Sequence, residues 1–157
     1  MANEILKLGY ESGIALLARQ DQTLGNVRNR ATALFSATTV ATSLAAAVGF
    51  LNRDLAKGAV IPDSAAIALI VIVVLVGVVS LFIVWPVDWV HGPSPAAFPP
   101  VATTLNEDTF RSSAIEHLTK GVLENERKLR RRQHALEVAI VLVVIELVVV
   151  FSLVFRM

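Results

Sequence analysis

The sequence has no cysteine among its 157 residues. Disulfide bonds and thiolate metal sites are therefore excluded, and cysteine usage says nothing about the redox compartment. Charged residues are scarce at 17%, whereas hydrophobic residues make up 55%, so both fractions depart from those of an average soluble domain. The net charge of +1 says little about partners, because the distribution of the charges matters more than their sum.

Motifs for catalysis are missing as well. The chain contains no nucleophile elbow, no glycine loop for phosphates and no His/carboxylate spacing for a metal. His91, His117 and His134 stand apart from further ligands, although a protein metal site needs several. We therefore expect no enzymatic activity, metal, cofactor or nucleic-acid partner, and we interpret the histidines as surface or interfacial polar residues.

The hydrophobic residues are concentrated in three runs, at 31–51, 65–85 and 136–155. A helix of about 20 residues crosses roughly 30 Å of hydrocarbon. Because the runs are rich in Val and Ile, buried parallel strands are the soluble alternative, but such strands extend over only about 4–8 residues between turn signals. The sequence thus predicts an all-α membrane protein with three transmembrane helices. The polar first 30 residues predict no signal peptide.

The basic residues indicate the orientation. Four Lys or Arg precede residue 31 and seven lie in 86–135, against two in 52–64 and one after 155. The positive-inside rule therefore places the N-terminus and residues 86–135 in the cytoplasm, and the loop 52–64 and the C-terminus outside. Trp85 and Trp89 flank Pro86, where we expect the second span to leave the membrane.

Two polar segments, 1–30 and 106–135, are predicted to be helices that continue into the first and third spans. Each has a seam at alternating spacings of three and four residues, which favours a coiled-coil-like stalk of parallel helices. Asn106 is the expected N-cap of the second helix. The first seam is Leu6, Tyr10, Gly13, Leu17, Gln20, Leu24, Val27, Ala31 and Leu34. The second is Phe110 or Arg111, Ile115, Leu118, Val122, Asn125, Leu129 and Arg132.

A proline-rich return, residues 86–105, connects the second span to the second cytoplasmic helix. Its prolines are Pro86, Pro93, Pro95, Pro99 and Pro100. They disfavour a helix, and an extended chain of this length reaches nearly 60 Å at about 3.1 Å per residue. The return is therefore long enough to lead back from the membrane surface to residue 106.

Hydroxyl groups collect on one side of the first span. At 100° per residue these side chains, the hydroxyl face, fall within an arc of about 160°. They could line a pore or cavity. Alternatively they could take part in close helix packing, because Ala37, Ala41, Ala45 and Gly49 follow a small-xxx-small spacing. The hydroxyl face consists of Ser36, Thr38, Thr39, Thr42 and Ser43.

Glu146 lies in the middle of the third hydrophobic run. A charged carboxylate there costs about 2.5–3.5 kcal/mol on insertion scales, so we expect it to be uncharged or turned toward a polar partner. The hydroxyl face lies at matching depth, and Thr39, Thr42 and Ser43 are the predicted contacts, within one subunit or across an oligomer interface. A functional ionisable group and a structural hydrogen bond between helices are both consistent with the pattern.

Basic residues gather where the cytoplasmic helices enter the membrane. They would attract anionic lipid, at about 1 kcal/mol per basic residue. A sharper alternative is a shared site for an anion or nucleotide. The residues concerned are Arg28, Arg30, Arg127, Lys128, Arg130, Arg131 and Arg132.

The order of elements resembles a known group. A helix with LARQDQTLGNVRNRA enters the first span, the second span ends in Trp-Pro, and a helix with VLENERKLRRRQHAL enters the third. This layout is similar to that of the Pycsar membrane effectors and the SLATT proteins of bacterial phage defence. The resemblance implies oligomerisation in the bacterial inner membrane and membrane disruption or ion leakage on a cyclic nucleotide signal. These 157 residues show no nucleotide-sensing domain, so direct gating by the nucleotide is not expected.

Two functions are therefore expected. The first is a homo-oligomeric membrane effector or channel-like pore, in contact with anionic lipids. The alternative is a scaffold or accessory subunit that docks a larger membrane complex, with a protein partner on its cytoplasmic helices.

Overall fold

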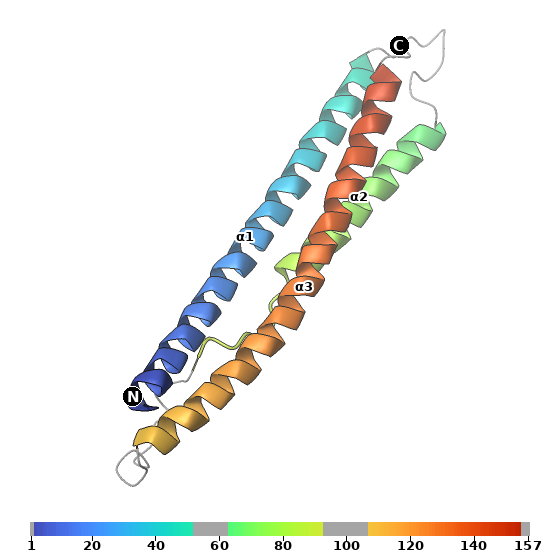
Figure 1. Ribbon diagram of the computed structural model, residues 1–157. Coiled ribbons are helices and arrows are strands. Elements are labelled where there is room, and N and C mark those ends of the chain that lie inside the picture. The colour runs from blue at the N-terminus through green and yellow to red at the C-terminus, as the bar shows by residue number, and fades with distance from the viewer. Residues whose placement is uncertain (1, 52–62, 93–106, 155–157) are drawn as a thin grey trace. The chain divides into compact units, whose positions relative to one another are not determined.

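The computed structural model describes residues 2–51, 63–92 and 107–154. These ranges hold three helices and no strand: α1 (Ala2–Leu51), α2 (Asp63–Val84) and α3 (Glu107–Val154) (Figure 1). The all-α prediction is confirmed for this part of the chain. Each of the two long polar segments is also continuous with the apolar run that follows it. Three predicted features lie outside the described residues: the N-cap Asn106, most of the loop 52–64, and the part of the proline-rich return after residue 92.

The chain divides into two compact units. The first unit comprises residues 1–26 and 86–131, and the second unit comprises residues 27–85 and 132–157. The division follows composition, because the second unit contains the three hydrophobic runs and the first contains the polar segments.

In the first unit, α1 and α3 pack through the predicted seams. Leu17 and Leu24 of α1 and Leu118 of α3 are each 3% exposed. The glycine at position 13 permits a close approach, since a Cβ built there would lie 3.1 Å from Cδ1 of Leu118. Gln20 Nε2 donates to the carbonyl oxygen of Val122 at 3.0 Å. The apolar seam residues therefore form the core of this unit.

The segment that follows α2 is also held in the first unit. Residues 86–91 form no helix, which follows from Pro86, because proline disfavours helix in the preceding residue and lacks an N–H donor. The Asn125 amide binds both backbone groups of Val90: Val90 N donates to Oδ1 at 3.1 Å, and Nδ2 donates to Val90 O at 2.8 Å. Figure 1 shows this segment passing between α1 and α3.

Two glycines make room for this segment. At Gly92 the φ angle is +115°, which L side chains rarely adopt. A Cβ at Gly121 of α3 would lie 2.7 Å from Cγ1 of Val90, closer than real Cβ contacts. Residues 86–91 can therefore pack on α3 at this point because Gly121 has no side chain.

In the second unit, α2 packs with the apolar portions of α1 and α3. Val76 and Ile83 of α2 and Ala31 of α1 have no exposed surface. Gly77 of α2 lies against the ring of Phe35 of α1. A Cβ added at Gly77 would lie 3.2 Å from Cε2 of that ring. Small residues thus allow α1 and α2 to approach closely.

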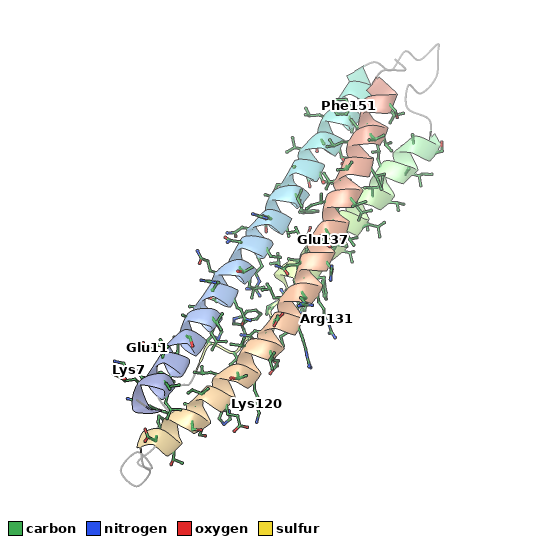
Figure 2. All side chains as sticks on the ribbon, in the orientation of Figure 1. Lys7, Glu11, Lys120, Arg131, Glu137 and Phe151 are labelled. Carbon is green, nitrogen blue, oxygen red and sulfur yellow. The ribbon has the colours of Figure 1, made fainter. Side chains whose placement is uncertain are left out.

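Most of the apolar surface of this unit stays exposed. The most apolar 18-residue windows of α2 and α3 are each only 22% buried, and by length and composition these two helices could cross a membrane. A core helix of a soluble protein would be mostly buried. Among the described residues, α1 is not counted with α2 and α3 as a helix apolar enough to cross a membrane. The side chains of Ile67, Ile70, Val148 and Phe151 are more than half exposed (Figure 2 labels Phe151).

We predict opposite effects for alanine at two glycines of the first unit. In a helix, Gly→Ala ordinarily stabilises by up to about 1 kcal/mol. Gly25→Ala should do so, because nothing lies within 4 Å of the added Cβ. Gly121→Ala should instead displace Val90 and speed chymotrypsin cleavage after Trp89. Equal protection from cleavage in both variants would contradict the packing of residues 86–92 on α3.

Candidate functional site: a buried carboxyl in the second unit

The buried side of α3 follows one spacing along the helix. Its buried residues recur every three or four positions. Three are polar, namely Asn125, Arg132 and Glu146, and each binds a different element of the chain. The full series is Leu118, Gly121, Asn125, Leu129, Arg132, Leu136, Ala139, Val143 and Glu146. The buried side of α3 therefore extends the predicted seam beyond Arg132 to Glu146.

Glu146 has no exposed surface. The hydroxyl Oγ1 of Thr42, on α1, donates to Oε1 of the carboxyl at 2.6 Å, at the short end of the range for an O–H···O hydrogen bond. The second oxygen, Oε2, is buried and has no hydrogen-bond partner among the described residues. A buried polar atom without a partner is costly. The carboxyl is thus only half satisfied by the protein.

Thr38 is the second hydroxyl of the site, and unlike the half-buried Thr42 it is fully buried. It is 1% exposed, and its Oγ1 also lacks a partner in the described part of the chain. Thr38 precedes Thr42 by one helical turn, and residues four apart lie on the same helix face. The buried face of α1 therefore contributes two hydroxyls, of which one is bound to Glu146.

Within the single chain, the other two predicted contacts of Glu146 are not formed, whereas contacts across an oligomer interface stay a prediction. Thr39 and Ser43 are exposed, and their hydroxyls donate to the carbonyl oxygens of Phe35 and Thr39, at 2.9 and 2.7 Å. Such bonds to the preceding turn are common for Ser and Thr in helices. The hydroxyl face is therefore split, with Thr38 and Thr42 inside and Thr39 and Ser43 outside, together with the exposed Ser36.

Arg132 and Arg28 bind the end of α2. Arg132 is 5% exposed, and its guanidinium donates to the carbonyl oxygens of Ile83 and Trp85. Arg28 donates to the same Trp85 oxygen at 3.5 Å. The last carbonyls of a helix lack partners and carry partial negative charge, which cations stabilise. Burial lowers the pKa of the Arg132 guanidinium, and the charge of Arg28 lowers it further.

The remaining basic residues of the predicted lipid or anion site lie closer to water. Arg30, Arg127, Arg130 and Arg131 are exposed (Figure 2 labels Arg131). Arg130 pairs with Glu126 at 3.1 Å. Lys128 is half-buried, pairs with Glu124 at 2.6 Å and donates to the carbonyl of Asp88. The lipid or anion site itself stays a prediction.

The histidines occupy the surface. His91, His117 and His134 are exposed, and Nδ1 of His134 lies 3.0 Å from Oε2 of Glu137. Figure 2 labels Glu137, which is also exposed. Within residues 2–51, 63–92 and 107–154, no group of three or more His, Asp or Glu could hold a metal ion.

No protein-family model, curated protein or solved structure matches the chain. The resemblance to the Pycsar and SLATT membrane effectors therefore stays a prediction, and the function has to be argued from the buried carboxyl and its surroundings.

We predict that Thr42→Val destabilises the second unit, because Glu146 loses its hydrogen-bond donor. The expected loss is about 1–3 kcal/mol, as for a buried group left without its partner. Thr39→Val is the matched control, since Thr39 is exposed and bonds within its own helix, and should change stability by less than about 0.5 kcal/mol. Thermal unfolding in a mild detergent measures both. Equal unfolding midpoints for the two variants would contradict the assignment.

Proposed function

We propose that this chain is a bacterial inner-membrane protein with three spans, which self-assembles and acts as a membrane effector or channel-like pore. The single observation that carries the proposal is the fully buried carboxyl of Glu146 on an otherwise apolar stretch of α3. An ionisable residue in the middle of a membrane-spanning helix costs free energy, and in membrane proteins it usually marks an ion pathway or a proton relay.

The exposed apolar surface of the second unit supports a membrane location. Large side chains such as Ile70, Val74 and Leu81 of α2 are more than half exposed. In water this surface would drive aggregation, whereas in lipid it needs no partner. The first span, 31–51 of α1, completes the set of three in the proposal, because it is about 20 residues long and has no ionisable group.

The excess of Lys and Arg before residue 31 and in 86–135 supports an N-terminus in the cytoplasm and a C-terminus outside. In this arrangement the first unit lies in the cytoplasm. The seam contacts of α1 and α3 in that unit, such as Gly13 with Leu118, support a coiled-coil-like stalk. The basic residues at its base contact anionic lipids.

Self-assembly is required because three spans cannot enclose a pathway alone. Ser36, Thr39 and Ser43 form an exposed strip on α1, and hydroxyls and small residues are the usual contacts between membrane helices. In the proposed oligomer this strip faces a neighbouring copy or the pathway. The activating signal would be a cyclic nucleotide or a protein partner.

A second candidate function is that of a scaffold or accessory subunit. It is favoured by apolar side chains on the outer side of α1 in the first unit, where Ile5 and Leu8 are 71% and 68% exposed. Such side chains could dock a partner helix. In that case Glu146 only joins α1 to α3.

The test is to express the chain in bacteria and follow the membrane potential with a fluorescent dye. Wild type should depolarise the cells, and Glu146→Leu, which removes the intramembrane carboxyl, should abolish the effect at equal amounts of membrane-inserted protein. Glu137→Leu is the matched control, because that carboxyl is exposed on the same helix, and should retain depolarisation. Absence of depolarisation together with a stable co-purifying protein would favour the scaffold. A monomeric mass in mild detergent would contradict self-assembly.

A further inference from the structure

We propose that Glu146 is a reversible proton-binding site within the membrane, with Thr42 as its hydrogen-bond donor. The inference rests on the proposed function insofar as the second unit crosses lipid. The inference goes beyond the proposed function because it names the ligand, a proton.

The two carboxyl oxygens of Glu146 have different surroundings. Oε1 accepts the hydrogen bond from Thr42, whereas Oε2 is buried and lacks a donor among the described residues. As a carboxylate, the group would hold a full charge in hydrocarbon with a single hydrogen bond, which is very unfavourable. A proton on Oε2 removes the charge and leaves the bond from Thr42 intact. The geometry therefore suits the acid form, with the proton on the oxygen that has no donor.

Among the described residues, no neighbouring charge replaces that proton. The apolar stretch 31–51 of α1 and the stretch 64–84 of α2 contain no titratable side chain, so the groups that α1 presents are the neutral Thr38 and Thr42. On α3 the nearest charged groups are Glu137 and Arg132, which precede Glu146 by 9 and 14 residues. At about 1.5 Å per residue these offsets are roughly 13 and 21 Å along the axis. Glu137 is engaged with His134, and Arg132 with the end of α2.

The set of oxygens also favours a proton over a metal cation. Hard cations in proteins take about six or more oxygen ligands. Here Oε2 of Glu146 and Oγ1 of Thr38 are the buried side-chain oxygens without partners in the described part of the second unit. A proton needs one oxygen to bond to and one acceptor nearby. A hydroxyl is both donor and acceptor, and Thr38 is the other hydroxyl on this face of α1, one turn before Thr42.

The experiment uses a hydrophobic carbodiimide on the full chain in lipid vesicles, with the adduct located by peptide mass spectrometry. A protonated carboxyl adds across one C=N bond of the reagent: the acid oxygen bonds to carbon and the proton goes to nitrogen. A carboxylate has no proton to transfer and does not start the reaction. We expect labelling of Glu146 at acidic pH that falls progressively as the pH is raised.

Matched variants identify the labelled group. Glu146→Gln keeps an acceptor for Thr42 but cannot take up a proton, and should lose the adduct while remaining helical and membrane-inserted. Glu137→Gln should leave the labelling of Glu146 unchanged, since its side chain is exposed and paired elsewhere. Replacing choline chloride with sodium chloride should have no effect on the adduct.

Three results would overturn the proposal. An absence of labelling at every pH would mean that no proton is bound, and equal labelling from acidic to alkaline pH would mean a permanently neutral structural acid. Protection by sodium would assign the site to a metal cation. The membrane-potential assay is independent. Labelling without depolarisation would contradict the channel-like pore and support the proton site. Depolarisation without labelling would support the pore and contradict the proton site.

Discussion

A carboxyl group removed from water must find a hydrogen-bond partner, and in the second unit Glu146 finds Thr42. The bond restricts which faces of α1 and α3 meet there, because a rotation of either helix by one residue would turn the hydroxyl or the carboxyl away from the contact. It also decides which hydroxyls are left outside. The hydroxyls of Thr39 and Ser43 lie outside the contact and donate to carbonyl oxygens of their own helix, so that side of α1 stays exposed.

The same rule applies along the rest of α3. Asn125 binds both backbone groups of Val90, Arg132 binds the last carbonyls of α2, and Glu146 binds α1. All three lie on one buried series whose other members are apolar. The apolar members supply burial without direction, whereas each polar member has few acceptable partners and so sets a position. One helix thereby orders the extended segment in the first unit, and α2 and α1 in the second.

The sequence predicts the two long helices correctly because their periodicity is strong and no proline interrupts them. The contact of Glu146 with Thr42 is predictable too, since the hydroxyl face is the one polar surface that the hydrophobic runs offer at the level of Glu146. The angular positions of the hydroxyls on the helix do not show which of them are buried. Continuing the seam of α1 four residues beyond Leu34 would have identified Thr38 as buried. Counting on from Leu136 would likewise have reached Glu146. The role of Arg132 could not be found this way, because it depends on where α2 ends in space.

The account depends on three helices crossing lipid with the first unit in the cytoplasm, and cysteine labelling in intact cells tests this most directly. The chain has no native cysteine, so single cysteines at Ser12, Lys57 and Ser112 can be labelled without background by a membrane-impermeant maleimide. The account predicts labelling of Lys57→Cys in intact cells, and labelling of Ser12→Cys and Ser112→Cys only after permeabilisation. Labelling of Ser12→Cys and Ser112→Cys from opposite sides of the membrane would contradict it.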